Sequence, residues 1–217
     1  MHKVEFENIT LWHADCREVL PLLSGVDAVI SDPPYGMKWD GKVTRGKNGT
    51  GKQGPTKHHG KTIMHDDEPF DPSPWLTFPR VVLFGSNHFG QRLPVGSTLV
   101  WLKRYDEGFG SFLSDAEVAW MKGGHGVYCK RDVSLQGESK ERMHPTQKPV
   151  PLMSWCIEMA KVPKGATVLD PYAGSGTTGI ACIRSGYKFI GIEKDARHFA
   201  NICKRIEQEL SQLQLGL

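Results

Sequence analysis

The glycine-rich segment VLDPYAGSGTTG, residues 168–179, places the strongest constraint on how this chain folds. Its residues Gly174, Gly176 and Gly179 have the spacing G-x-G-x-x-G. The run ATVLD before it (166–170) is typical of a buried strand, GTTGIACIRSG (176–186) of a helix that ends at glycine, and YKFIGIE (187–193) of a second strand. Glycines in such a loop let the backbone approach a ligand, and the helix N-terminus favours negative charge. The segment therefore predicts a nucleotide-binding unit of an α/β fold.

Two carboxylates at the predicted strand ends indicate which nucleotide binds. Glu193 ends the strand after the helix, where an acid can bind ribose hydroxyls. Asp170 would repel a pyrophosphate but attract a cation. Residues 170–173 also separate the strand from the glycines, whereas an NAD site usually turns into its glycine loop at once. S-adenosylmethionine (AdoMet) carries an ammonium group and a ribose but no phosphate, so we predict AdoMet rather than NAD.

Strand-like and helical segments alternate along the rest of the chain. Further strands are predicted at ITLWHAD (9–15), VDAVIS (26–31), RVVLFGS (80–86) and STLVWLKR (97–104), and helices at CREVLPLL (16–23), NHFGQRL (87–93), PVPLMSWCIEMA (149–160) and the amphipathic C-terminal segment. The alternation predicts a Rossmann-like, doubly wound, mostly parallel sheet. Because one helix alone follows Glu193, the remaining strands must come from earlier in the chain. Residues 105–142 lack a clear period and are predicted to form a small irregular or β-rich insertion.

Composition narrows the function classes. The net charge of +3 is only mildly basic, but residues 36–61 hold seven Lys or Arg and one acid, a local charge of 7 − 1 = +6. We expect a mobile basic loop over residues 36–65. No apolar run approaches the roughly 20 residues that span a bilayer, and the five cysteines include no CxxC pair. These features predict a cytoplasmic protein without a membrane segment or a metal site.

The stretch DAVISDPPYG, residues 27–36, has two interpretations. Prolines fix their own φ and disfavour the helical region for the residue before them, so Asp32, Pro33, Pro34 and Tyr35 could simply be a stiff turn after a strand. The same rigidity would also hold an acid, backbone carbonyls and an aromatic ring toward a ligand. In a doubly wound sheet, this segment and the glycine loop would meet at the carboxyl ends of the strands.

Three segments together resemble a known family. DPPYG, HPTQKP (144–149) and DPYAGSGTTG, in that order, resemble the β-class amino-DNA methyltransferases, and the resemblance covers nearly the whole chain apart from the insertion. It implies methyl transfer from AdoMet to the exocyclic N6 of adenine in duplex DNA after base flipping. Asp32 at the first position favours adenine, and N4 of cytosine or an RNA substrate is the alternative. An NAD-dependent oxidoreductase and a DNA-binding protein that has lost catalysis are the competing classes.

The resemblance also assigns roles to residues. Asp32 and the carbonyl of Pro33 would accept hydrogen bonds from the target amine, with Pro34 between them and Tyr35, which would stack on the flipped base. Lys148 would pair with the carboxylate of the cofactor, although a solvated side chain is the simpler interpretation. For Asp15, implied to lie against the cofactor adenine, a helix cap is the alternative. The full cofactor set implied is Asp15, Cys16, Asp32, His144, Thr146, Gln147, Lys148, Asp170, Ala173, Gly174, Ser175, Gly176, Thr177, Glu193 and Lys194.

DNA contacts are expected in two places. The basic loop would bind phosphates, although an inert solvated linker is the alternative, and the insertion would read bases. The predicted contacts are Lys38, Trp39, Lys42, Arg45, Lys47, Lys52, Lys103 and Arg104. The chain would then divide into a catalytic half (1–104), a target-recognition insertion (105–142) and an AdoMet-binding half (143–217). A homodimer is expected because the insertion is short, and the enzyme would work either beside a restriction endonuclease or alone.

Overall fold

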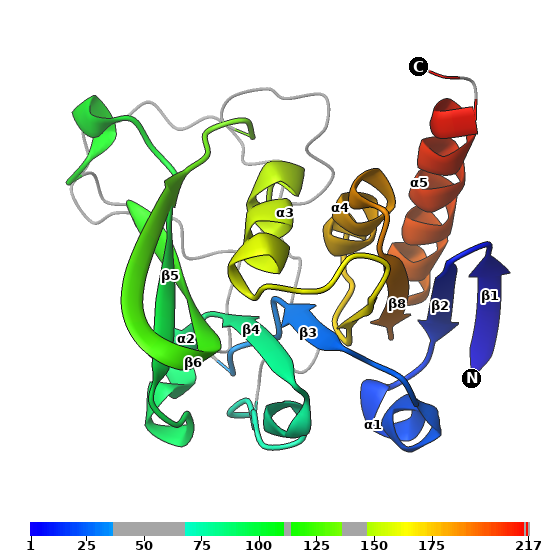
Figure 1. Cartoon of the computed structure of the whole chain (residues 1–217), viewed down its shortest axis with the longest axis horizontal. Helices are drawn as coiled ribbons and strands as arrows, with labels where there is room; N and C mark the ends of the chain where they lie inside the picture. Colours follow the sequence, from blue (N-terminus) through cyan, green and yellow to red (C-terminus); the bar gives the residue numbers. More distant parts are fainter. Residues whose placement is uncertain (37–67, 111–113, 136–146, 215, 217) are drawn as a thin grey trace, which may run out of the picture.

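The computed structural model describes residues 1–36, 68–110, 114–135, 147–214 and 216. Within them an eight-stranded sheet forms the centre of the molecule (Figure 1). Its strands, in spatial order, are β1 (His2–Phe6), β2 (Ile9–His13), β8 (Lys188–Glu193), β7 (Thr167–Asp170), β3 (Ala28–Ser31), β4 (Arg80–Phe84), β6 (Ala116–Arg131) and β5 (Gly96–Leu102). In the spatial order, each of β2, β8, β7 and β3 runs parallel to the next strand, ending with β4. β1 is antiparallel to β2, and β6 is antiparallel to β4. The predicted mostly parallel α/β sheet is confirmed, and β1 is a strand that the sequence pattern did not predict.

Helices cover both faces of the sheet. Figure 1 shows α3 (Val150–Met159), α4 (Thr177–Ser185) and α5 (Ala196–Gln214) along one face, with α1 (Cys16–Val19) and α2 (Ser86–Phe89) on the other. Short 3-10 helices lie at Leu20–Leu22, Trp75–Thr77, Gly90–Arg92 and Asp106–Gly108. In the part of the chain that the structure describes, no helix is long and apolar enough to cross a membrane.

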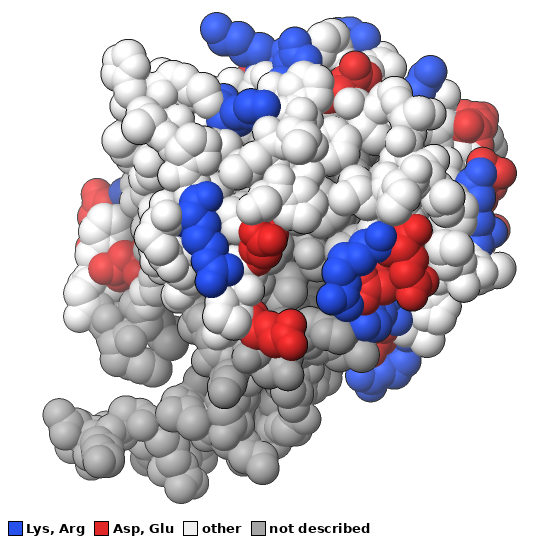
Figure 2. Space-filling view, turned by 90° about the horizontal axis from the view of Figure 1, so that it is seen from below, with Lys and Arg blue, Asp and Glu red and all other residues white. Residues whose placement is uncertain are grey.

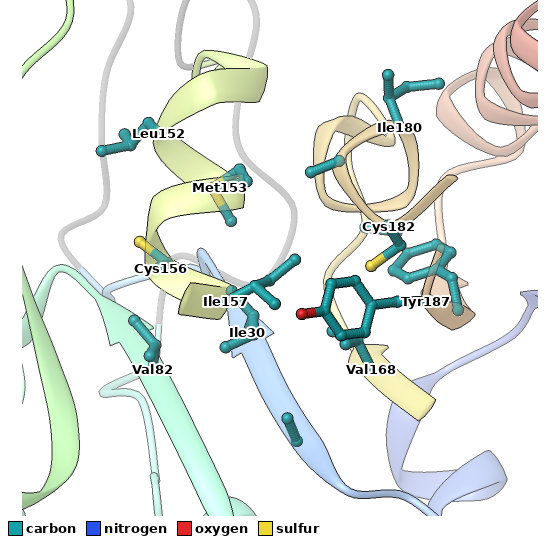
Figure 3. Packing of buried hydrophobic residues seen from close by; sticks show 14 of the residues in the cluster. Ile30, Val82, Leu152, Met153, Cys156, Ile157, Val168, Ile180, Cys182 and Tyr187 are labelled. Atoms are coloured by element: carbon teal, nitrogen blue, oxygen red, sulfur yellow. The ribbon is translucent and has the colours of Figure 1, made fainter. Parts of the chain in front are cut away.

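The apolar runs in the strands explain why both faces are covered. Side chains alternate between the two faces of a strand, and in β3 Ala28 and Ile30 pack into one core cluster while Val29 packs into the other. A strand with apolar side chains on both faces therefore needs helices on both sides. Figure 3 shows the first core, where Leu152, Met153, Cys156 and Ile157 of α3 lie near Ile30, Val82 and Val168 of the sheet and near Ile180 and Cys182 of α4.

The region predicted as an insertion contributes β6 to this same sheet. Along the first part of β6, residue numbers fall as those of the paired β5 residues rise, with Ser97 opposite Met121. Along the second part, both rise together, with Thr98 opposite Val127. The strand therefore folds back around β5 near Gly123 and Gly124, whose φ values of 84° and 69° suit glycine. Figure 1 shows β6 as a long curved arrow beside β5. This curvature brings the start of β6 next to β4.

The order of the strands creates a switch point between β3 and β7. The chain continues from β3 to its neighbour β4 on one side and from β7 to its neighbour β8 on the other. Ligands in open α/β sheets bind beyond the carboxyl ends of the strands at such a point. The residues that follow Ser31 and those that follow Asp170 lie there, which is where the two sequence motifs were expected to meet.

Candidate functional site

A hydrogen bond joins the two motifs across the switch point. Ser31, the last residue of β3, donates from Oγ to Oδ1 of Asp170, the last residue of β7, over 2.5 Å. Asp170 also accepts from Thr178 Oγ1 at 2.6 Å and from the backbone N–H of Tyr172 at 3.2 Å. Burial raises the pKa of Asp170 to about 6, although the hydrogen bonds favour its ionised form. The carboxylate therefore fixes the glycine loop against β3.

The glycine loop is hydrogen-bonded to Glu193, the last residue of β8. Glu193 accepts from the backbone N–H of Gly174 at Oε2 (2.8 Å) and from that of Asp195 at Oε1 (2.7 Å). Burial raises the pKa of Glu193 above its ordinary value. Gly176 precedes α4 in the left-handed region, with φ of 75°. Arg205 of α5 donates to the carbonyl of Ser175 at 2.7 Å, so the loop is held from two sides.

Asp32 lies just beyond β3 and accepts from one cationic donor and one hydroxyl donor. Lys148 Nζ lies 2.5 Å from its Oδ2, and the hydroxyl of Tyr35 donates to its Oδ1. Lys148 is buried, whereas the side chain of Asp32 remains 25% exposed. Together with buried Gln147, Lys148 belongs to the segment that leads into α3, whose N-cap is Pro149. The HPTQKP motif thus reaches the DPPY motif through Lys148, which is 116 residues away from Asp32 in the sequence.

The ring of Tyr35 is held in a narrow slot. It stacks on His88 of α2 with ring centroids 4.9 Å apart and an interplanar angle of 12°. On another side it lies against Gly85, where a Cβ atom would come within 2.0 Å of Tyr35 Cε1. Burial, followed by the charge of Asp32, raises the pKa of Tyr35 well above its ordinary value. Tyr35 is therefore a neutral phenol that donates to Asp32.

A second acid reaches this cluster from β6. Glu117 Oε2 lies 2.9 Å from Lys148 Nζ, and Glu117 Oε1 accepts from Lys103 Nζ at 2.9 Å. Burial disfavours the charge of Lys148, but Asp32, Tyr35 and Glu117 more than offset it and raise its pKa well above the ordinary value. Burial likewise opposes ionisation of Glu117, but Lys148 and Lys103 bring its pKa below the ordinary value. The cluster is thus a chain of alternating charges.

Asp15 is a helix cap, as its alternative interpretation predicted. It is the N-cap of α1 and accepts from the backbone N–H of Arg17 at 3.0 Å. It also pairs with the side chain of Arg17 at 2.7 Å and with Lys194 Nζ at 2.9 Å. The hydrogen bond from Arg17, opposed by burial and assisted by Lys194, holds the pKa of Asp15 well below its usual range. Cys16 is buried, and burial raises the pKa of its thiol.

Two of the predicted DNA contacts lie in described parts of the chain. Lys103 pairs with Glu117, and Arg104 NH1 donates to the carbonyl of Gly108 at 3.2 Å, so both engage their own chain. The other predicted contacts, Lys38, Trp39, Lys42, Arg45, Lys47 and Lys52, lie outside the described residues, as do His144 and Thr146. On the face in Figure 2, Lys and Arg are interspersed with Asp and Glu. All DNA contacts therefore stay predictions.

Sequence reasoning missed several residues of the site. Glu117 sits in the segment without a clear period, and His88 follows β4 in a short helix that carries no motif. Ser31 and Thr178 flank the motifs but were not assigned a role. The available signal for Ser31 was its position at the end of an apolar strand, because another predicted strand ends on Asp170. For Glu117 and His88 the chain offered none, because neither lies at the end of a predicted strand or within a motif.

Known proteins resemble this chain in sequence and in fold. A family model described as DNA methylase matches residues 98–204. Over this segment, just under half of its length, the chain is similar to that DNA methylase family. Among curated relatives, the Type II methyltransferase M2.DpnII of Streptococcus pneumoniae is 44% identical over 66 residues, 30% of this chain and 24% of that protein. The Type II methyltransferase M2.MboI of Moraxella bovis is 40% identical over 74 residues, 34% of this chain and 26% of that protein. The matched segments thus span about a quarter of these relatives.

Solved structures of DNA methyltransferases share the fold. The M1.HpyAVI–SAM complex superposes with a TM-score of 0.59 at 23% identity, covering 91% of this chain and 99% of that one. The cytosine-N4-specific PvuII DNA methyltransferase gives a TM-score of 0.58 at 13% identity, covering 97% and 94%. TTHA0409 of Thermus thermophilus, complexed with S-adenosyl-L-methionine, gives 0.53 at 20% identity, covering 92% and 95%. At these identities the likeness establishes the fold.

Proposed function

We propose that this chain is an AdoMet-dependent DNA methyltransferase that methylates the N6 amine of adenine. The observation that carries the proposal is the junction of the two motifs: Ser31 and Asp170 are hydrogen-bonded over 2.5 Å, so the DPPY segment and the glycine loop share one edge of the sheet. A methyl donor in the loop would therefore lie beside an amine held at Asp32. The family and the AdoMet complexes among its structural relatives support this pairing.

The residues around the glycine loop fit AdoMet. Each carboxylate oxygen of Glu193 accepts one backbone hydrogen bond and retains a second lone pair for a ribose hydroxyl. Asp170 is raised in pKa by burial to about 6, and a nearby ammonium group would lower its pKa and favour its charge. Gly174 and Gly176 have positive φ and no side chain to obstruct the backbone. When bound, AdoMet supplies an electrophilic methyl group on a sulfonium.

The DPPY side suits an amine nucleophile. The lone pair of an aromatic amine is delocalised into its ring, so acceptors for its protons favour its localisation and attack on the methyl group. Asp32 and the carbonyl of Pro33 are the proposed acceptors in this segment, and Tyr35 is proposed to stack on the flipped base. The high pKa of Lys148, which Asp32, Tyr35 and Glu117 raise despite burial, keeps this lysine cationic. Lys148 therefore orients and neutralises the carboxylates of Asp32 and Glu117, and Asp32 would accept a hydrogen bond from the amine.

Adenine is proposed over cytosine because the first residue of the motif is Asp32 rather than serine.

Duplex DNA is the proposed partner, and a second copy of the chain would enlarge the surface that contacts it. Sedimentation that shows only a monomer, with and without DNA, would contradict the homodimer. The cysteines, all five unpaired, support a location in the reducing cytoplasm.

The product of the reaction tests the proposal. The protein is incubated with AdoMet and unmethylated duplex DNA, the DNA is digested to nucleosides, and methylated nucleosides are identified by mass. N6-methyladenine is the expected product. N4-methylcytosine would replace adenine by cytosine as the substrate, and the absence of both on DNA of varied sequence would refute the proposal. Single-stranded RNA of the same sequence serves as the control for substrate class.

A further inference from the structure

The acceptor atoms of Asp32 are already occupied. Oδ1 receives the hydroxyl of Tyr35, and Oδ2 lies 2.5 Å from Lys148 Nζ. Each oxygen retains a second lone pair, so an amine that donates to this carboxylate shares an oxygen with one of these groups and weakens its hold. If Lys148 moved away without another partner, its buried ammonium group would be uncompensated, which is strongly unfavourable. The site needs a second acceptor for Lys148.

Glu117 has the geometry of that acceptor. Its Oε2 is 2.9 Å from Lys148 Nζ, so the two groups already form an ion pair. Yet Oε2 is buried and has no hydrogen-bond partner among the described residues, which means that the ammonium is not aligned with it. Lys148 is aligned with Asp32 instead. Reorienting the ammonium toward Glu117 would satisfy this buried oxygen and release Oδ2 of Asp32.

Glu117 is also rigidly placed. It lies on β6 and pairs with Trp101 of β5 in the sheet, and its other oxygen is fixed by Lys103 at 2.9 Å. Asp32, in contrast, follows β3 in a loop and is partly exposed. A carboxylate on a strand keeps its position while a ligand enters, which is the requirement for holding a neighbouring group in place.

We propose that Glu117 is a positioning residue that takes over the ammonium group of Lys148 when Asp32 binds the target amine. This inference rests on the proposed methyl transfer. Lys148 stays protonated throughout, and no bond other than hydrogen bonds changes in the exchange. The substrate amine gains the oxygen that Lys148 leaves, so Glu117 acts on the reaction through Lys148.

The variant Glu117→Gln tests this role. It keeps the size of the side chain and a hydrogen-bond acceptor for Lys103 but removes the charge that attracts Lys148. We expect kcat for DNA methylation to fall about tenfold or more while the Kd for AdoMet changes less than about twofold. Glu117→Asp retains the charge and should recover part of the lost kcat. Glu209→Gln is the matched control, because Glu209 forms an ion pair with Arg184 away from the site at 2.6 Å.

The outcomes are separable. An unchanged kcat in Glu117→Gln overturns the inference, and so does Glu117→Asp being no more active than Glu117→Gln. Parallel losses of AdoMet affinity and thermal stability in both variants would assign Glu117 a merely structural role and likewise overturn it. The wild-type protein is measured in the same assay: if it methylates no DNA, the proposed function itself fails, whereas an active wild type with an active Glu117→Gln refutes the positioning role alone.

Discussion

In the glycine-loop half, Asp170 accepts from Ser31, 139 residues away. The other donors to Asp170 and Glu193 belong to the same segment, such as Thr178, which is 8 residues after Asp170, and Gly174, which is 19 residues before Glu193. In the DPPY half, Asp32 is held by Lys148, which is 116 residues away. Apart from Ser31, the first set consists of backbone N–H groups and a hydroxyl in one strand–loop–helix unit. The second is an ion pair between distant segments. The cofactor side is thus fixed largely by local hydrogen bonds together with Ser31, and the amine side by an ion pair that depends on tertiary packing.

This difference suits the two proposed tasks. A cofactor loop benefits from being formed in advance, since ordering it on binding would reduce affinity. The carboxylate that meets a flipped base has to exchange partners, and a charged side chain with a second acceptor nearby allows that. The comparison therefore predicts that changes in the DPPY half alter turnover, whereas changes in the glycine-loop half alter binding of AdoMet or stability.

The largest effect is expected for Asp32→Ala. Removing the carboxylate eliminates the acceptor for the target amine, so kcat should fall by about a thousandfold or more, in the range seen when a group that stabilises a transition state is removed. The Kd for AdoMet should stay close to the wild-type value, because the glycine loop and Glu193 keep their hydrogen bonds. Steady-state methylation and calorimetric titration with AdoMet measure the two quantities.

Asp71→Ala is the control for Asp32→Ala, because Asp71 is an acid in an exposed turn that accepts from Ser73. It should methylate DNA at the wild-type rate. Retained turnover in Asp32→Ala would remove Asp32 from the catalytic site. Loss of AdoMet binding along with turnover would show that the two halves of the site are not independent.

A smaller effect is expected for Gly85→Ala. The new methyl group would lie within 2.0 Å of the Tyr35 ring, at a φ of 73° that disfavours alanine. Tyr35 should leave its stack on His88, and kcat should fall about ten- to a hundredfold, as expected for a misplaced contact with the substrate. AdoMet affinity should be unchanged. Fluorescence of a 2-aminopurine target base in bound DNA would report the altered stacking.

Gly25→Ala separates backbone strain from the clash with Tyr35. Gly25 has a φ of 69°, but nothing lies within 4 Å of the place that a Cβ atom would take there. Its substitution therefore carries the strain, on the order of 1 kcal/mol, without moving an aromatic ring. Equal losses of kcat in the two variants would mean that strain accounts for the effect of Gly85→Ala. Tyr35 would then have no demonstrated role in turnover.

The sequence predicted the parts of the molecule whose partners are near in the chain. The strand, glycine loop, helix and strand over 166–193 are as expected, because apolar runs, glycine and capping signals act over short distances. The cap at Asp15 also follows from its neighbours. The fold class then followed from alternation, and the meeting of the two motifs followed from the rule that strands of a parallel sheet end at one edge.

Long-range contacts could not be predicted in this way. The folding of β6 around β5 depends on Gly123 and Gly124, which sit in a segment of glycine and polar residues without period. As a result, Glu117 gave no sign that it would reach Lys148. The expected partner of Lys148 was the cofactor, whereas the structure pairs it with Asp32 and Glu117. Ion pairs between distant segments are set by packing and leave no local pattern.

The smallest expected effect concerns Asp170 and the pH dependence of stability. Burial raises its pKa to about 6 from 3.8, so the folded protein binds more protons than the unfolded chain between these pH values. The contribution of Asp170 to stability is therefore present at low pH and is lost as the pH rises through about 6. Relative to Asp170→Asn, the wild type should gain about 1 kcal/mol in free energy of unfolding between pH 7 and pH 5. Urea denaturation at each pH measures the difference.

Asp195→Asn should show the opposite slope. Backbone N–H groups of His198 and Arg197 lower the pKa of Asp195, so its contribution is lost as the pH falls. The same titration with saturating AdoMet sharpens the comparison between the halves. An ammonium group beside Asp170 would lower its pKa and flatten the difference between wild type and Asp170→Asn. If the difference keeps its full slope with AdoMet bound, Asp170 holds the loop against β3 without contacting the cation, and binding must rest on Glu193 and the loop itself.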